Sequence, residues 1–469
     1  MPSPPELTQA IADEISLAAG PGNFSTSTKK RLLYSADAKQ RQVFPAGVVR
    51  TADAERVAAV MAVCYRHKIP MVPRGAGSGL TGGALPAPGS VVLDMSGMNR
   101  ILSINPHDQT AVVQPGVITA NLQKAAEKQG LFYPPDPASV NFCTLGGNVA
   151  ENAGGLRAVK YGVTRDYVLA LKAVLPDGRP FKTASGTLKN VVGYDLTRLL
   201  VGSEGTLAVI TELTLRLLPL PEAKRTLNAY YPTLEQGAAA VQAVLASGIR
   251  PAALEFMDQA TLRAVNAFAK LGLPEGAEAL VLVDIDGPPE VLARQAETLG
   301  ELLKKAGGDP VSIAATAKEI DELWAARRMA GPAILSIAPD KLNEDIVVPL
   351  SALAEMVRRV QAIGEKYQVA TVSFGHAGDG NLHVNLMYDA GQPGQEDGAL
   401  GAVNEVFAQA LALGGSLSGE HGVGNTKIHH FPDEVDPVAL AVMQRIKKAF
   451  DPEGLLNPGK AVPAPESGL

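Results

Sequence analysis

Apolar residues recur along the chain with two periods, one typical of helices and one typical of strands. After Thr51, a residue type that caps helices, they stand at positions i, i+3, i+4 and i+7, which form one face of a helix. The residues of this face are Val57, Val60, Met61 and Cys64. Runs of β-branched residues between turn signals then predict strands at 69–75, 91–95, 101–105 and 110–116. Thr119 is the expected cap of a second helix, which stops at Gly130.

The pattern changes at two prolines near the middle of the chain. Before them, Asp177 and Gly178 lie between two strand-like runs, as a hairpin turn requires, and a further strand is predicted over 207–219. Pro219 and Pro221, followed by polar residues, mark a domain boundary. Beyond it strand and helix signals alternate, which is typical of an α+β layer with helices on one face. The predicted helices lie at 234–246, 317–328, 403–413 and 437–450.

The composition excludes several classes of protein. With 469 residues the chain is about three times as long as a typical domain, so we expect two domains or one elaborate domain. Acidic and basic residues are mixed and sum to −6, which argues against nucleic acid as a partner. Cys64 and Cys143 are the only cysteines. They can build neither a disulfide framework nor a Cys-ligated metal site, and we expect both to be buried.

The sequence carries no recognisable signal for export or membrane insertion. The first 20 residues lack a basic stretch followed by an apolar core, and no run of about 18 apolar residues follows later. We therefore expect a cytoplasmic protein, with peripheral attachment to a membrane as the alternative.

A glycine-rich loop is the first candidate for chemistry. Gly77, Gly79 and Gly82 match the dinucleotide-binding fingerprint letter for letter. Such a fingerprint opens a helix, whereas here prolines and a strand follow, and Asp94 comes 12 residues after Gly82 rather than about 20. A nest of backbone N–H groups that binds phosphate is one interpretation, and a flexible turn is the other. The 22-residue excursion over 134–155 favours the first, because long loops in compact chains are usually functional.

Four motifs resemble, in order and spacing, the FAD-binding domain of the vanillyl-alcohol oxidase and p-cresol methylhydroxylase family. They are PRGAGSGLTGG (73–83), PPDPAS (134–139), LGGNVAENAGG (145–155) and VGSEGTLAVIT (201–211). The resemblance implies an α+β fold with two subdomains, between which FAD lies extended. It also implies the FAD contacts: Arg74, Gly75, Ala76, Gly77, Ser78, Gly79 and Gly83 at the pyrophosphate, and Pro135, Ser139, Gly146, Asn148, Ala150, Gly155, Glu204, Ile210 and Asn457 elsewhere.

Some relatives attach the flavin covalently to a histidine within the glycine loop. Residues 74–83 contain no histidine, so we expect non-covalent FAD. A thioether from Cys143 is the alternative, and we favour a small buried thiol at this position.

Histidines cluster in two short motifs near the C-terminus, FGHAGDGNLHVN (374–385) and SGEHGVG (418–424). On one straight strand His376 and His383 would point to opposite faces. The AGDG turn removes this constraint, because a strand that ends at His376 and another that begins at Asn381 can bring both rings to one site. In the second strand Asn381, His383 and Asn385 share a face.

Two imidazoles and the carboxylate of Glu420 make a three-ligand set of the kind found in catalytic Zn, Mn or Fe sites. Histidines that only satisfy turns are the alternative. His421, adjacent to Glu420, points elsewhere on an extended chain and is free to act as a base. His429 and His430 lie in a polar segment, so we expect them at the surface.

The two motifs and DPEGLLNPGK (451–460) resemble the C-terminal half of the FAD-dependent D-2-hydroxyacid dehydrogenases. That group includes the flavin subunit of bacterial glycolate oxidase, D-lactate dehydrogenases and D-2-hydroxyglutarate dehydrogenase. The resemblance spans about 34–460. It implies that His376, His383 and Glu420 bind a divalent metal where one is present, that Asn385 touches substrate, and that His421 takes the hydroxyl proton.

A substrate carboxylate needs a cation, and arginine can bind it bidentately. The segment LWAARR (323–328) looks like the Leu-Trp-x-x-Arg motif of the same family. This register selects Arg327, with Arg328 as the alternative. Lys341 corresponds to a lysine on the carboxylate side of the substrate in some relatives.

The resemblance therefore predicts an oxidoreductase that converts a D-2-hydroxy acid, such as D-lactate, glycolate or D-2-hydroxyglutarate, into the 2-oxo acid by hydride transfer to FAD. The chain has no Cys cluster for an internal relay, so electrons pass to a quinone, a cytochrome, an electron-transfer flavoprotein or an iron–sulfur subunit. A homodimer or a subunit of a complex is expected. The alternatives are oxidation of another alcohol, sugar acid or aldonolactone, the alkyl transfer of ether-lipid synthesis, and a non-catalytic flavin subunit.

Three segments are expected. The first, 1–220, is the FAD-binding domain, with its core from about residue 34. The second, 221–425, is an α+β, ferredoxin-like substrate domain that carries the metal and catalytic motifs. The third, 426–469, is a C-terminal helix that returns to the FAD-binding domain.

Overall fold

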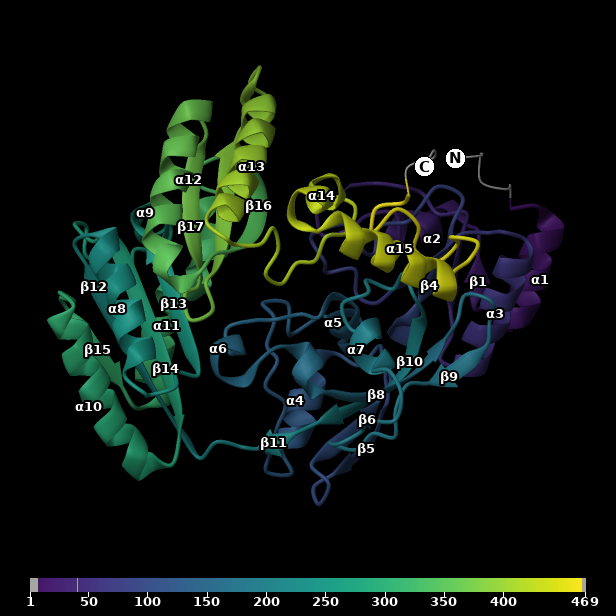
Figure 1. Ribbon diagram of the computed structural model, residues 1–469, viewed down its shortest axis with the longest axis horizontal. Coiled ribbons are helices and arrows are strands. Elements are labelled where there is room, and N and C mark those ends of the chain that lie inside the picture. Colours follow the sequence, from purple (N-terminus) through teal and green to yellow (C-terminus); the bar gives the residue numbers. More distant parts are fainter. Residues whose placement is uncertain (1–6, 40, 466–469) are drawn as a thin grey trace. The chain divides into compact units, whose positions relative to one another are not determined.

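The computed structural model of the protein describes residues 7–39 and 41–465, so the first six residues of the acidic N-terminal segment lie outside the described part. The chain forms two compact units. Unit 1 comprises the chain up to Gly154, Val163–Leu220 and the chain from Glu420 onward, and unit 2 comprises Gly155–Gly162 and Pro221–Gly419. The C-terminal segment, yellow in Figure 1, thus belongs to the same unit as the N-terminal segment, purple in Figure 1.

Unit 1 contains two main sheets. The strands of the first are β1 (Phe24–Ser25), β2 (Gly47–Arg50), β3 (Met71–Arg74) and β4 (Val91–Asp94). Their order is β1-β2-β4-β3, with β2, β4 and β3 parallel. The strands of the second are β5 (Ile101–Asn105), β6 (Thr110–Val113), β8 (Val168–Val174), β9 (Pro180–Lys182) and β10 (Val209–Arg216). Their order is β5-β6-β10-β8-β9, all antiparallel. A separate pair is formed by β7 (Leu131–Phe132) and β11 (Leu218–Pro219).

The helices of unit 1 are α1 (Gln9–Ala19), α2 (Thr28–Leu33), α3 (Ala54–Arg66), α4 (Thr119–Glu127), α5 (Leu145–Glu151), α7 (Leu196–Leu200), α14 (Phe431–Glu434) and α15 (Pro437–Phe450). Two of them, α1 and α3, pack against the parallel sheet. The apolar face predicted after Thr51 is confirmed: it belongs to α3 and packs with Ile15 of α1 and with β3 and β4. Its cap is Asp53 rather than Thr51, because the Asp53 carboxylate accepts the N–H of Glu55 at 2.8 Å.

Two further expectations for unit 1 are wrong. Thr119 is the first helical residue of α4 and does not cap it; its buried hydroxyl lies 3.3 Å from Cys143 Sγ and accepts from Asn148 Nδ2 at 2.7 Å. The long excursion is not loop throughout, because it contains α5, which Thr144 caps. Two glycines within this helix weaken the helical pattern in the sequence. Gly146 is needed for packing, because a Cβ there would lie 3.0 Å from the Pro115 carbonyl oxygen. Both cysteines are buried, as predicted.

Unit 2 is built on one antiparallel seven-stranded sheet. Its strands are β12 (Ala223–Tyr231), β13 (Ala253–Asp258), β14 (Ala279–Gly287), β15 (Val311–Ala314), β16 (Asp340–Val347), β17 (Ala370–His376) and β18 (Asn381–Tyr388). Their order is β15-β12-β14-β13-β17-β18-β16. The predicted hairpin is confirmed, since β17 ends at His376 and β18 begins at Asn381.

Helices cover both faces of this sheet, so the expectation of helices on one face is wrong. They are α8 (Leu234–Ala246), α9 (Gln259–Ala269), α10 (Pro289–Lys305), α11 (Ala317–Ile334), α12 (Leu353–Tyr367) and α13 (Gln395–Ala412) (Figure 1). The short helix α6 (Ala158–Tyr161) also belongs to unit 2. Leu254, Phe256 and Val384 pack in the cluster that contains α8, α10, α12 and α13, whereas Met257 and Phe374 pack with α9 and α11. The reason is visible in β14, whose residues from Ala279 to Ile285 are all buried, as in strands covered on both sides.

Asp258 joins three elements of unit 2. Its Oδ1 accepts from the N–H of Thr261 at 2.8 Å and from the Thr261 hydroxyl at 2.7 Å, which caps α9. Its Oδ2 accepts from the N–H of Ser373 in β17 at 2.8 Å. Burial raises the pKa of Asp258 to about 6, although these hydrogen bonds oppose the shift.

A pH-dependent stability follows from this carboxyl. The folded-state pKa lies above the unfolded-state value of about 4, so the cost of the buried charge is absent below pH 4 and fully present above pH 6. We expect the free energy of unfolding of the wild type, measured in urea relative to Asp258→Asn, to fall by about 3 kcal/mol as pH rises through this window. A difference between the two proteins that stays constant from pH 4 to 6 would contradict the assignment.

Candidate active site

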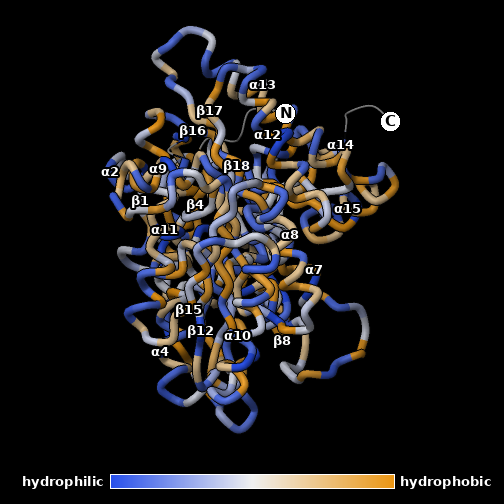
Figure 2. Tube along the Cα trace, turned by 90° about the vertical axis from the view of Figure 1, so that its left-hand side faces the viewer, coloured by the Kyte–Doolittle hydropathy of each residue, from blue (hydrophilic) through white to orange (hydrophobic). Residues whose placement is uncertain are grey.

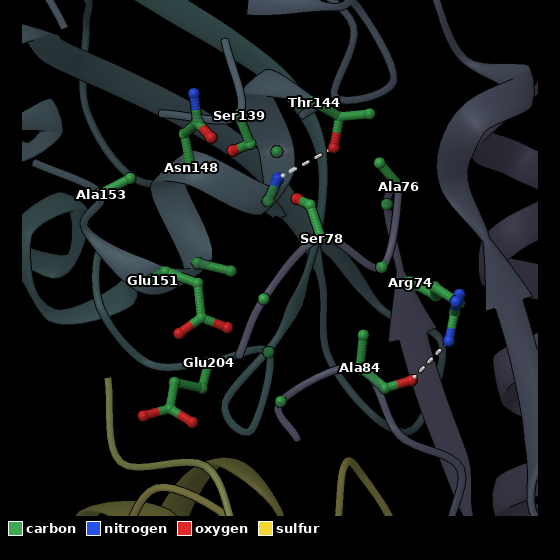
Figure 3. Close-up of a pocket in the computed structure, with 18 of the residues that line it drawn as sticks. Arg74, Ala76, Ser78, Ala84, Ser139, Thr144, Asn148, Glu151, Ala153 and Glu204 are labelled. Atoms are coloured by element: carbon green, nitrogen blue, oxygen red, sulfur yellow. Dashed lines mark hydrogen bonds between the residues drawn. The ribbon is translucent and has the colours of Figure 1, made fainter. Parts of the chain in front are cut away.

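A pocket of about 420 Å³ opens in unit 1, lined by the glycine loop after β3, by α5 and by the start of β10. Figure 3 shows residues of the glycine loop and of α5 around it. Most of the predicted FAD contacts line it: Arg74, Gly75, Ala76, Gly77, Ser78, Gly79, Gly83, Ser139, Gly146, Asn148, Ala150, Glu204 and Ile210. The structure therefore brings together motifs that are up to about 130 residues apart in the sequence. Glu420 and His421, the predicted ligand and base, line the same pocket.

Three predicted contacts lie elsewhere. Pro135 is buried, and its carbonyl accepts from Gln123 Nε2 at 2.9 Å. Gly155 belongs to unit 2. Asn457 lies behind the pocket wall, where its Nδ2 donates to the carbonyls of Gly83 at 3.0 Å and Glu204 at 2.6 Å. Asn457 thus holds together two segments that line the pocket.

The glycine loop fits a phosphate group. Gly77 has a φ of +72°, and a Cβ there would lie 2.2 Å from Nη2 of Arg74. The Arg74 side chain is nearly buried, and its Nη1 donates to the carbonyl of Ala84 at 3.2 Å (Figure 3). A glycine-rich turn with a positive φ beside a positive charge is typical of the nests that bind anions. Asp94, by contrast, accepts from the Tyr34 hydroxyl at 2.5 Å and caps a turn, which is a structural role.

Three ionisable side chains, Glu151, Glu204 and Lys460, gather at the pocket, and of these only Glu204 was a predicted site residue. Glu151 and Glu204 both line it, and burial raises the pKa of each; for Glu151 the nearby Glu204 raises the pKa further. Burial lowers the pKa of Lys460 to about 7, while Glu204 and Glu151 oppose the shift. The Lys460 ammonium donates to the Gly83 carbonyl at 3.0 Å and to Asn457 Oδ1 at 2.7 Å. Glu151 lies in the motif LGGNVAENAGG and Lys460 in DPEGLLNPGK. Their place in these motifs was the sequence signal that could have identified them.

Glu204 links the pocket to the second histidine motif. Its two oxygens accept the N–H groups of Val423 and Gly424, each at 2.8 Å. The hydroxyl of Thr81, in the glycine loop, donates to the carbonyl of His421 at 2.9 Å. The segment that carries His421 is therefore fastened to the pocket on both sides.

In unit 2 the strand register gathers polar residues on one face of the sheet. Glu255 lies opposite His376, and Phe374 lies opposite His383, which in turn lies opposite Asp345. Directly opposed residues share a face. The Nε2 atoms of His376 and His383 are 3.4 Å apart, and both rings are nearly buried.

Glu255 connects this pair to the predicted carboxylate anchor. Its Oε1 lies 2.6 Å from His376 Nδ1, and its Oε2 accepts from Arg327 Nε of α11 at 2.6 Å. Burial raises the pKa of Glu255, but the charges and hydrogen bonds of His376 and Arg327 outweigh burial, so the pKa lies below its ordinary value. Sequence analysis missed Glu255, although an acidic residue within the buried strand ALEFMD was a signal.

The structure separates the two candidate arginines. Arg327 belongs to the Glu255 array, and its guanidinium carbon lies 4.7 Å from the centre of the Phe374 ring. Arg328 is exposed and pairs with Asp321 at 2.9 Å on the surface of α11. The tryptophan of the same motif, Trp324, donates to Asp284 Oδ1 at 3.0 Å.

The other predicted residues of unit 2 take different places. Asn385 is fully buried, and its Oδ1 accepts from Asn343 Nδ2 at 2.8 Å. Lys341 is exposed on β16 opposite Met387. At the end of the unit, Asp345 Oδ2 accepts the N–H of Gly419 at 2.7 Å, which holds the chain immediately before Glu420.

Comparison with known proteins identifies the class. Residues 45–184 match the family model described as an FAD binding domain, and residues 220–461 match the model for the C-terminal domain of FAD-linked oxidases. The chain belongs to the FAD-linked oxidase family, which confirms the predicted resemblance and FAD as the cofactor.

Particular relatives span nearly the whole chain. The glycolate oxidase subunit GlcD of Bacillus subtilis is 43% identical over 455 residues, which cover 97% of each chain. A D-lactate dehydrogenase of Anaerostipes hadrus is 39% identical over 89% of each chain.

Solved structures with little sequence identity share the fold. A p-cresol methylhydroxylase matches with a TM-score of 0.82 at 17% identity, covering 98% of this chain and 99% of that one. An alkyldihydroxyacetonephosphate synthase matches with a TM-score of 0.76 at 19% identity, covering 98% and 86%. These matches confirm the predicted α+β fold of the vanillyl-alcohol oxidase type. Among the described residues, no helix combines the length and apolar character needed to cross a membrane.

The glycine loop can be tested with a matched pair of substitutions. Gly77→Ala and Gly130→Ala both place a side chain at a φ near +70°, but only the first meets other atoms within 4 Å. Displacing Arg74 removes a charged hydrogen-bond donor, typically worth 1.5–3 kcal/mol, so Gly77→Ala should weaken FAD binding about 10- to 100-fold. Gly130→Ala should keep the wild-type affinity. Flavin absorbance after equilibrium dialysis measures both, and equal affinities would contradict the prediction.

Proposed function

We propose that this protein oxidises a D-2-hydroxy acid, of the D-lactate, glycolate or D-2-hydroxyglutarate class, to the 2-oxo acid with FAD as the electron acceptor. Membership of the FAD-linked oxidase family supports the redox chemistry. The names of the relatives, glycolate oxidase subunit and D-lactate dehydrogenase, support the substrate class.

The observation that carries this proposal is the array of Arg327, Glu255 and His376. A 2-hydroxy acid has a carboxylate and a hydroxyl on adjacent carbons. In the array Glu255 engages Nε of Arg327, which leaves the two Nη groups to receive a carboxylate in the forked geometry that arginine favours. The Glu255 carboxylate also contacts His376. The Nε2 atom of His376 lies beside Nε2 of His383, where the two rings can contact the substrate hydroxyl.

Each residue then has a defined task. Arg327 binds the substrate carboxylate, with Lys341 at the same end, and Asn385 contacts the substrate. His421 removes the hydroxyl proton as the hydrogen on Cα leaves with its electron pair. Bound FAD supplies the acceptor for that hydride. Glu204 and Thr81 keep the backbone of the His421 segment in place during this step.

A divalent Zn, Mn or Fe ion fits the histidine pair. Two nitrogen ligands at about 2.0–2.1 Å from a tetrahedral ion lie roughly 3.4 Å apart, and the Nε2 atoms of His376 and His383 are separated by 3.4 Å. Glu420, which follows the anchored Gly419, is the third ligand in this proposal. An ion held by these residues would lower the pKa of a hydroxyl bound to it and so would assist His421.

Electrons leave the flavin through a separate acceptor. The two cysteines of the chain are buried and cannot hold a redox cluster. A quinone, a cytochrome, an electron-transfer flavoprotein or an iron–sulfur subunit can serve, and the relatives named as glycolate oxidase subunits support assembly into a complex.

Anaerobic stopped-flow mixing tests the proposed reaction. D-Lactate, glycolate or D-2-hydroxyglutarate should bleach the flavin absorbance of the wild type. His421→Ala should slow this step about 10²- to 10⁴-fold, the usual contribution of a general base, at unchanged FAD content. His429→Ala, at an exposed histidine nearby in the sequence, is the control. Bleaching of His421→Ala at the wild-type rate would remove His421 from this role.

Removal of the metal tests the ligand set. Elemental analysis should find a divalent ion in the purified protein, and chelation should abolish turnover until the ion is restored. Glu420→Gln should lower both metal content and turnover, because it removes a charged oxygen ligand, whereas Glu434→Gln, at an exposed glutamate, should change neither. Full turnover of the metal-free protein would contradict the metal assignment.

A further inference from the structure

The Glu255 side chain contacts both Arg327 and His376. It lies on β13, one strand from His376 in the sheet and directly opposite it in register. Only about 1% of its surface is exposed. Its two oxygens are divided between its partners, Oε1 to His376 Nδ1 and Oε2 to Arg327 Nε, both at 2.6 Å.

Because each Glu255 oxygen binds a different residue, Glu255 determines which atoms of His376 and Arg327 remain for other ligands. An arginine Nε–H can only donate, so Oε2 must accept from it. When His376 donates its Nδ1–H to Oε1, its proton is held on Nδ1 and the lone pair remains on Nε2. Nε2 is the atom that lies 3.4 Å from Nε2 of His383. The Phe374 ring adds a second constraint on the guanidinium of Arg327.

We propose that Glu255 is a positioning residue that sets the tautomer of His376 and the orientation of Arg327 together, and so couples the hydroxyl end of the site to its carboxylate end. This inference rests on the proposed function. In it a single buried carboxylate determines both how the substrate carboxylate is held and which nitrogen of His376 is available as a ligand.

The variant Glu255→Gln separates positioning from packing, because it keeps the size of the side chain. The amide oxygen must face Arg327 Nε, which only donates, so the amide NH₂ faces His376 Nδ1. The NH₂ group can donate only to an unprotonated Nδ1, and the His376 proton therefore moves to Nε2. A histidine with this tautomer cannot offer Nε2 to a metal.

The tautomer can be measured directly in the metal-free protein. Nitrogen-15 chemical shifts of labelled histidines distinguish Nδ1–H from Nε2–H at mildly alkaline pH, where an ordinary imidazole is neutral. His376→Gln assigns the signal. The wild type should show Nδ1–H and Glu255→Gln should show Nε2–H. An Nε2–H tautomer in the wild type, or an unchanged tautomer in Glu255→Gln, overturns the proposal.

Two further measurements follow the consequences. The affinity for Zn²⁺, determined by competition with a chromophoric chelator, should fall about 10- to 100-fold in Glu255→Gln. The KM for the substrate that bleaches the flavin should rise less in Glu255→Gln than in Arg327→Met, because the amide oxygen still accepts from Arg327 Nε but no longer carries a charge.

Asp284→Asn is the matched control. Asp284 is another buried acidic residue, on the neighbouring strand β14, and it accepts from Trp324 and Thr226 rather than from the site. Its substitution should lower stability but leave the His376 tautomer, the Zn²⁺ affinity and KM unchanged. Equal Zn²⁺ affinity losses in Asp284→Asn and Glu255→Gln would reduce Glu255 to a structural role. If no 2-hydroxy acid bleaches the wild-type flavin, the proposed function fails, whereas the tautomer measurement still decides the role of Glu255.

Discussion

A carboxylate removed from water must be paired or protonated, and this requirement governs both functional regions of the protein. In unit 2, Glu255 meets it with two cationic or polar partners, one at each oxygen. In unit 1, Glu204 meets it with two backbone N–H groups, while Lys460 lies close enough to oppose the effect of burial. In each case the groups that satisfy the carboxylate belong to segments far away in the sequence. The buried charges therefore tie distant segments to one another at the positions where chemistry is expected.

The sheet of unit 2 supplies the platform for the polar array. Because antiparallel register places opposed residues on the same face, Glu255, His376 and Asn381 form one row and Phe374, His383 and Asp345 form the next. The opposite face carries a continuous apolar cluster beneath the four helices α8, α10, α12 and α13. On the polar face, α11 contributes both apolar residues and Arg327, so one helix covers part of the sheet and delivers the guanidinium. Rigid elements of this kind hold side chains more precisely than loops do.

Unit 1 contains most of the segment that matches the FAD binding domain, and a glycine-rich loop lines its pocket. Its glycine loop turns at Gly77 with a positive φ and packs against a buried arginine. Lys460, Asn457 and Thr81 then connect this loop to the C-terminal segments, so the wall of the pocket and the His421 segment form one hydrogen-bonded body. The C-terminal return to this unit brings His421, the proposed base, to the pocket that most of the predicted FAD contacts line.

Local sequence patterns were sufficient for elements whose identity depends on neighbouring residues. The face of α3, the hairpin between β17 and β18 and the limits of α8 and α15 follow from periodicity and turn residues, and the FAD motifs follow from their order and spacing. Tertiary structure alone decided what depends on contacts across the chain. It placed a helix in a glycine-rich segment because Gly146 must approach Pro115 closely, covered the second face of the unit 2 sheet, and distinguished Arg327 from Arg328. It also revealed Glu255 and Lys460, because the role of a buried charge is set by its partners in space, which no local pattern encodes.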